Sequence, residues 1–128
     1  MKQRYIFWGA ILAGLAVILG ALGAHALAEK LEPVYVETFK TGVQYQMYHA
    51  FAIILVGILY RYRQSPHLKN ALIAFMLGIL FFSGSLYMIT IGKLVEKSFR
   101  WIGPITPIGG LGFIIGWVFV ALAFYKKK

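Results

Sequence analysis

The side chains of this sequence that could do chemistry gather near the ends of two apolar stretches. His25 lies near the end of the first stretch, and a denser polar set lies at the start of the second: Gln44, Tyr45, Gln46, Tyr48 and His49. Gln46 and His49 are three residues apart, so on a helix they share a face. Polar groups at membrane depth are costly unless they are paired, and they often mark function. These six residues are therefore the candidate ligand-binding residues.

Three interpretations of this cluster compete. The favoured one is that its members hydrogen-bond between helices and hold them together. In the second, they line a polar cavity that binds or passes a small molecule, a lipid or a proton, since a neutral histidine can relay protons. In the third, His25 and His49 hold a metal or a haem, but two histidines without a recognised spacing are weak evidence. We therefore expect no metal and no cofactor.

The sequence gives little support for an enzyme. No acidic residue occurs inside any long apolar run, and cysteine is absent, which excludes thiol catalysis. Ser83 and Ser85 lie in the third apolar run, but no pattern places a base beside them, and a nucleophile needs a base within hydrogen-bond reach. Bonding to the backbone of their own helix or packing at a helix contact explains both serines. We expect no enzymatic activity.

The segments that must position the polar cluster are membrane-spanning helices. Hydrophobic residues make up 60% of the chain and charged residues 13%, whereas a soluble domain carries roughly 25% charged residues. About 20 apolar residues are needed for a helix to span the hydrocarbon. Four charge-free runs meet that length: residues 5–28, 41–60, 70–92 and 101–125. The sequence predicts an all-α, polytopic integral membrane protein, a four-transmembrane-helix bundle within a single transmembrane domain (1–128), with spans at about 5–26, 42–61, 70–92 and 106–125.

The charges predict the orientation of these spans. The net charge is +9, but the basic residues lie at the ends of apolar segments instead of forming a stripe, so we expect no nucleic-acid partner. Eight basic residues fall on the side of the two termini, and five, together with all four acids, fall on the other. Because short cytoplasmic loops are rich in Lys and Arg, both termini are expected in the cytoplasm of a multi-pass cell-membrane protein. A cleaved signal peptide ending at Ala24-His25-Ala26 is the less favoured alternative.

Small residues predict where the helices meet, because they let backbones approach closely in lipid. On the first helix they occupy about one half-circle, which predicts that this helix is wedged between neighbours: Gly9, Ala10, Ala13, Gly14, Ala16, Gly20, Ala21, Gly23 and Ala24. The other helices have narrower stripes: Gly42, Gln46, His49, Ile53 and Gly57; Ala71, Ala74, Gly78, Ser85 and Gly92; Gly109, Gly112, Gly116 and Ala123. Internal packing is favoured. Contacts within a homo-oligomer or with another membrane protein remain alternatives, and the lipid bilayer is the expected surrounding.

Two connections have helix signals of their own. Residues 27–40 repeat apolar side chains every fourth position, which is typical of an amphipathic connector at the membrane surface. Thr106 and Pro107 have the residue types of an N-cap and a first helical position, which predicts that the fourth helix begins there.

Four sequence patches together resemble a known family: GALGAHAL (20–27), FKTGVQYQMYH (39–49), GSLY (84–87) and GPITPIGG (103–110). They are similar to the small bacterial membrane proteins called YwdK-like or UPF0382, a domain-of-unknown-function family related to a eukaryotic transmembrane protein. The resemblance covers nearly the whole chain, although Leu22 stands where the family pattern suggests Phe. It implies four spans and an inner-membrane location in bacteria, and it carries no catalytic roles.

The expected function is that of an uncharacterised small membrane protein with a structural or regulatory role. The alternative is a module that binds or transports a small molecule, a lipid or a proton through the polar cluster. The two differ in one observable feature. A continuous polar cavity that reaches His49 favours binding or transport, whereas a closed cluster with paired polar atoms favours a structural role.

Overall fold

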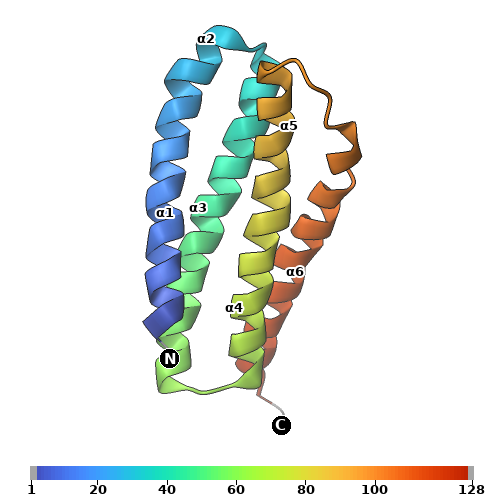
Figure 1. Cartoon of the computed structure of the whole chain (residues 1–128). Helices are drawn as coiled ribbons and strands as arrows, with labels where there is room; N and C mark the ends of the chain where they lie inside the picture. Colours follow the sequence, from blue (N-terminus) through green and yellow to red (C-terminus); the bar gives the residue numbers. More distant parts are fainter. Residues whose placement is uncertain (1–2, 127–128) are drawn as a thin grey trace.

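The computed structural model describes residues 3–126 and shows four helical rods that run up and down beside one another (Figure 1). The rods are, in chain order, α1 (Gln3–Leu22) with η1 (Gly23–Leu27) and α2 (Ala28–Lys30); α3 (Pro33–Tyr62); α4 (Pro66–Gly78) with η2 (Ile79–Ser83) and α5 (Gly84–Leu94); and, after the short turn η3 (Arg100–Ile102), α6 (Ile105–Ala123). All four are long and apolar enough to cross a membrane. The predicted all-α bundle of four spans is therefore confirmed.

The second rod is longer than the sequence pattern predicts. α3 begins at Pro33 instead of near residue 42, and an extended Glu32 separates it from the first rod. Proline suits a first helical turn because its fixed φ matches the helix and its missing N–H has no partner there. The expected connector at 27–40 is thus divided between the end of the first rod and the start of α3. At 30 residues α3 is about 45 Å long and exceeds the hydrocarbon thickness of about 30 Å.

The fourth rod also begins differently from the prediction. α6 starts at Ile105, after Pro104, and no side chain caps its first turn. Thr106 is therefore not the N-cap, because Pro104 has already adopted helical backbone angles. Its hydroxyl lies 2.6 Å from the Ser85 hydroxyl of α5 instead. Pro107 is tolerated because the first N–H groups of a helix have no partner within the helix.

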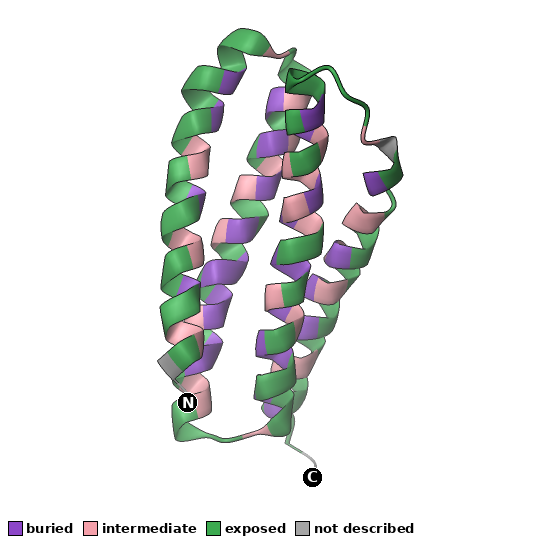
Figure 2. Cartoon of the chain, in the orientation of Figure 1, coloured by how far each residue is buried: buried purple, intermediate pink, exposed green. Residues whose placement is uncertain are grey.

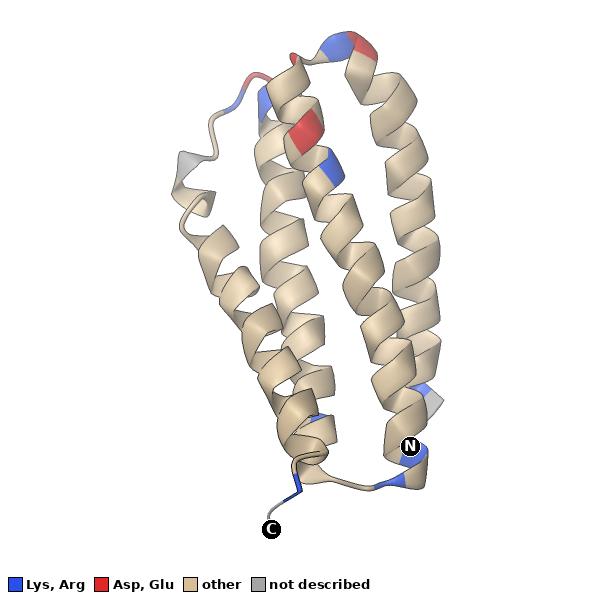
Figure 3. Ribbon diagram, turned by 180° about the vertical axis from the view of Figure 1, so that it is seen from behind, with Lys and Arg blue, Asp and Glu red and all other residues tan. Residues whose placement is uncertain are grey.

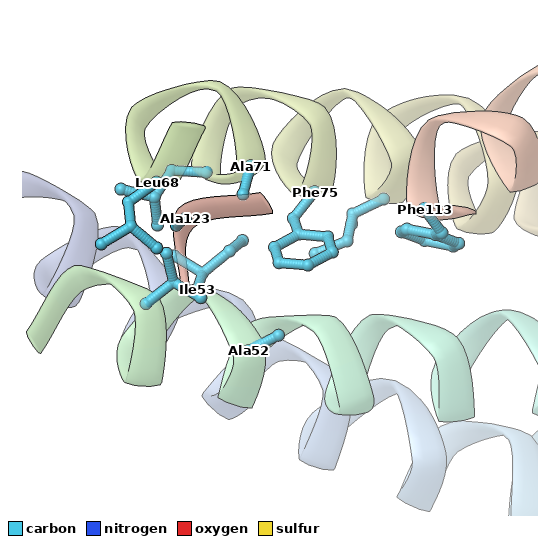
Figure 4. Close-up of a cluster of buried hydrophobic side chains, with 10 residues drawn as sticks. Ala52, Ile53, Leu68, Ala71, Phe75, Phe113 and Ala123 are labelled. Atoms are coloured by element: carbon cyan, nitrogen blue, oxygen red, sulfur yellow. The ribbon is translucent and has the colours of Figure 1, made fainter. Parts of the chain in front are cut away.

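The apolar core lies between α3, α4 and α6, in the half of the bundle nearest the described chain ends. Ile53 of α3, Leu68 and Phe75 of α4, and Phe113 of α6 meet there (Figure 4). The close approach of α6 to η2 depends on Gly109, because a Cβ at that position would overlap the backbone of Phe82. The buried polar residues of α3 and α5 lie from the middle of the bundle toward its other end, and the His49 ring contacts Phe75 and Phe113 of the core.

The small residues of the first rod form two stripes, of which only one is buried. Gly9, Ala16 and Gly23 are buried, whereas Gly14 and Ala21 are exposed (Figure 2). The prediction that the whole half-circle is wedged between neighbours is therefore only half right, since α1 packs mainly against α3. The stripes of the other rods are buried or half-buried, as internal packing predicts.

Charged residues lie at the two ends of the bundle and leave its middle uncharged (Figure 3). The described chain ends share one end of the bundle, together with Arg61 and Lys69. The four acids lie at the opposite end: Glu29, Glu32, Glu37 and Glu96. Lys2, Lys127 and Lys128, which contribute to the expected orientation, lie outside the described residues.

Candidate functional site

The six candidate residues do not form one site. Gln46 and His49 of α3 are buried, with 3% and 4% of their surface exposed. Gln44 and Tyr48 are exposed on the same helix, and His25 is exposed in η1. Tyr45 is also exposed, but its ring lies beside that of His49, with centroids 6.1 Å apart. The pattern of one α-helix explains this division, because positions 46 and 49 face the bundle while 44 and 48 face away from it.

Gln46 joins three rods. Its Nε2 donates to the backbone oxygen of Leu12 in α1 at 2.7 Å, and its Oε1 accepts from the hydroxyl of Tyr87 in α5 at 2.7 Å. The amide thus uses one donor and its acceptor on two neighbouring helices. The Tyr87 ring also packs against Phe39, with ring centroids 5.1 Å apart. This arrangement fixes α1 and α5 against the middle of α3.

Two serines make further bonds between rods. Ser83, at the end of η2, donates to the backbone oxygen of Gly42 in α3 at 2.7 Å. Ser85 donates to Phe82 of its own rod at 2.8 Å, and its oxygen lies 2.6 Å from the hydroxyl of Thr106 in α6. Since the Ser85 proton is used within its own rod, Thr106 is the donor between α6 and α5. Both serines serve helix packing.

His49 bonds to a different neighbour from Gln46. Its Nε2 lies 3.1 Å from Nε1 of Trp117 in α6, and its Nδ1 lies 2.9 Å from the backbone oxygen of Tyr45. An indole N–H can only donate, so Nε2 accepts and Nδ1 carries the proton of a neutral imidazole. The ring also stacks on Phe113, with centroids 3.6 Å apart. His49 would have to break its bond to Trp117 before Nε2 could bind a metal.

Gln46 and His49 do not belong to one hydrogen-bond network, although they share the inner side of α3. Residues three apart on a helix differ in direction by about 60°. That difference turns Gln46 toward α1 and α5 and turns His49 toward α6. We therefore do not expect loss of His49 to disturb the bonds that Gln46 makes to Leu12 and Tyr87.

A groove of about 500 Å³ reaches His49 from the outer surface of α6. Its walls are mainly apolar and aromatic and include Phe82, Leu111, Ile114 and Trp117. Leu111 and Ile114 are exposed. The groove therefore opens toward the surroundings of the bundle and brings no polar path to the histidine. Among the described residues, every buried side-chain nitrogen and oxygen has a hydrogen-bond partner.

Sequence reasoning missed two hydrogen-bond partners of the candidate residues, Tyr87 and Trp117. Tyr87 lies in the GSLY patch that marks the family resemblance, but periodicity alone does not show its contact with Gln46. Trp117 lies in the middle of an apolar run, away from the interface where tryptophan is favoured. A tryptophan at that depth needs an acceptor for its N–H. This requirement could have predicted a hydrogen bond from Trp117 to His49.

Comparison with known proteins shows the family. A family model described as "Protein of unknown function (DUF423)" matches residues 19–110. The UPF0382 membrane protein YwdK of Bacillus subtilis is 40% identical over 123 residues, covering 95% of this chain and 96% of that protein. The UPF0382 membrane proteins of Staphylococcus aureus (SAB0533) and Haemophilus influenzae are 39% and 37% identical, covering 97% and 100% of this chain and 97% and 98% of theirs. No solved structure matches. The chain belongs to the UPF0382 (DUF423) family of membrane proteins.

Proposed function

We propose that this chain has a non-enzymatic, structural or regulatory role in the cell membrane, and that it acts through its helix bundle and its contacts with other membrane-spanning helices. The observation that carries the proposal is that Gln46 and His49 bond to neighbouring rods, while the groove beside His49 is apolar. Hydrogen bonds between membrane helices contribute on average about 0.6 kcal/mol each. Together they favour one fixed arrangement of the four rods over a polar path through them.

Proton flux tests this role against the transport alternative. Full-length protein is reconstituted in liposomes that enclose a pH-sensitive dye, and a pH gradient is imposed. We expect wild-type protein and the His49→Leu variant to give the same slow dye response as protein-free liposomes. A flux that appears with wild type and with Gln44→Leu, but disappears with His49→Leu, would contradict the structural role and favour a proton relay.

The partner we propose is a second copy of this chain. The support is the open stripe of α1, where no atom of a neighbouring element lies within 4 Å of the Cβ position of Gly14 and where Ala21 is exposed. Small residues allow two helices to approach closely in lipid. Copies inserted with the same orientation would bring their α1 helices together in parallel, so equivalent positions would meet.

The absence of cysteine makes this pairing testable. Single variants Gly14→Cys and Ala21→Cys are oxidised in native membranes, and disulfide-linked dimers are measured on a non-reducing gel. We expect dimers from both variants and far fewer from the matched control Leu15→Cys, which lies on the large-residue side of α1 and is also exposed. Equal cross-linking at all three positions would argue against a defined α1 contact.

We further propose that the chain ends lie in the cytoplasm. The supporting observation is the distribution of charge between the two ends of the bundle. The end that holds the described chain ends has basic residues and no acid among the described residues, whereas the opposite end has both. Since both ends lie on one side, a single C-terminal fusion reports on both. A cytoplasm-dependent fluorescent reporter should be bright, and a reporter that is active only outside the membrane should be silent. The reverse pattern would refute the orientation.

The apolar groove beside His49 supports a second candidate function, the binding of a lipid chain or an apolar small molecule. Its volume is about 500 Å³, and Pro107 and Gly110 of α6 contribute to its wall. Gly110→Leu would fill part of this groove. If the groove holds a lipid chain, the native mass spectrum of the variant should show one fewer retained lipid than wild type. An unchanged lipid count would remove this candidate.

A further inference from the structure

A second hollow lies at the end of the bundle opposite the described chain ends. It has a volume of about 670 Å³ and is bounded by the start of α3, the end of α5 and the loop that follows α5. Among the described side chains, its charged lining consists of three lysines and two glutamates: Lys30, Lys93, Lys97, Glu32 and Glu96. This hollow is separate from the groove beside His49, with which it shares no lining residue.

Within the described part of the chain, the lysines of the hollow make no ion pair within 4 Å with its glutamates. Among the described side chains, the ion pair within 4 Å is Lys40 with Glu37, at 3.8 Å, and neither residue lines the hollow. Lys93 is instead positioned by the ring of Tyr35, whose centroid lies 5.2 Å from its Nζ. A cation over an aromatic face keeps its full charge and its remaining hydrogen-bond donors. The five charged groups leave the hollow with an excess of one positive charge.

Apart from Ser98 and Gly103, the rest of the lining is apolar or aromatic, and it lies at one end of the candidate spans, where a lipid headgroup would meet its chains. Leu31, Tyr35, Ile89 and Phe99 line the hollow and are half-buried. The nearby Trp101 is exposed in the loop before α6, as expected for a tryptophan at a membrane surface. A small free anion would contact only the lysines. A phospholipid would place its phosphate beside the lysines and its glycerol and first chain carbons against the apolar side chains.

We infer that this hollow binds the headgroup of an anionic phospholipid, with the phosphate between Lys93 and Lys97 and the upper chain carbons against Tyr35 and Phe99. A single phosphodiester charge matches the single excess positive charge of the lining. The inference is independent of the proposed structural role, because none of the bonds that hold the rods together involves these lysines.

Lipid binding to the full chain tests the inference. Protein in mild detergent is titrated with phosphatidylglycerol, phosphatidylethanolamine or phosphatidylcholine, and the bound fraction is measured by native mass spectrometry. We expect phosphatidylglycerol to bind most tightly, and we expect Lys93→Gln and Lys97→Gln each to weaken it about fivefold, the contribution of one lysine near an anionic membrane surface. Lys40→Gln is the matched control, since Lys40 lies at the same end outside the hollow, and it should leave binding unchanged.

Three results would overturn the inference. Equal binding of the three lipids would show no preference for an anionic headgroup. An equal loss in Lys40→Gln would show a general charge effect of this end of the bundle. Displacement of phosphatidylglycerol by soluble sn-glycerol 3-phosphate at equal concentration would identify a free phosphate as the ligand. The unfolding temperature of each variant in phosphatidylcholine, expected to equal that of wild type, excludes a folding defect as the cause.

Discussion

Gln46 and His49 are neighbours on the inner side of α3, yet they are used differently. Gln46 bonds to two other rods, through the Leu12 backbone and the Tyr87 hydroxyl, at 2.7 Å each. His49 makes one bond to its own helix and a longer one, 3.1 Å, to Trp117 of α6. It also borders a groove that opens to the outside and is lined by the aromatic rings of Phe82, Phe113 and Trp117.

This difference shows that similar polarity at similar depth does not imply a shared role. Gln46 is enclosed by three rods, so replacing it removes contacts that hold the bundle together. His49 is held mainly by the aromatic ring stacked on it and by one indole. Gln46 should therefore contribute more to stability, and His49 is the position where a ligand could compete with a protein contact.

The largest expected effect is that of Gln46→Leu. The change removes two bonds between rods and leaves the Tyr87 hydroxyl without its acceptor, so we expect a loss of about 1–2 kcal/mol in unfolding free energy. Reversible unfolding in mixed detergent micelles measures this value. Gln44→Leu, two positions away and exposed, should change the stability little. A similar loss of unfolding free energy in both variants would mean that any polar residue on α3 contributes to stability, and that the bond to Tyr87 has no special effect.

A smaller loss is expected for His49→Leu. Leucine keeps most of the apolar contact but removes the bond to Trp117 and the stacking on Phe113, which together contribute about 1 kcal/mol. The same unfolding measurement applies. If His49→Leu were more destabilising than Gln46→Leu, the ranking of the two positions would be wrong.

The smallest effect is expected for Trp117→Phe. Phenylalanine removes the N–H that bonds to His49 but keeps an aromatic ring beside Phe75, whose centroid lies 4.8 Å away. We expect a loss of about 0.5 kcal/mol, the average of one hydrogen bond between membrane helices. Tryptophan fluorescence of the variant should still show a folded protein. A loss of unfolding free energy larger than that of His49→Leu would mean that Trp117 has a role apart from this bond.

The sequence was sufficient to predict four helical spans, because hydrocarbon thickness and the need to pair every backbone group leave few other solutions for long uncharged runs. It did not predict where α3 begins or which residue precedes the first turn of α6. Pro33 starts α3 well before the apolar run from residue 41, and α6 begins at Ile105, directly after Pro104 and one residue before the predicted span, since proline geometry acts independently of hydrophobicity.

The partners of the candidate site were harder to predict. Periodicity places Gln46 and His49 on one side of α3, but it does not say which helix lies beside each of them. That information depends on how the rods are arranged around α3, which a single helix does not encode. For the same reason, the pattern could not distinguish the buried stripe at Gly9 from the open one at Gly14.

A pair of double-mutant cycles on unfolding in detergent tests most directly the claim that Gln46 and His49 bond α3 to different neighbouring rods. We expect Gln46→Leu with Tyr87→Phe to show a coupling of about 0.6–1.7 kcal/mol, from the average to the largest value for bonds between membrane helices, and Gln46→Leu with His49→Leu to show a coupling near zero. Zero coupling between Gln46 and Tyr87, or strong coupling between Gln46 and His49, would contradict this account.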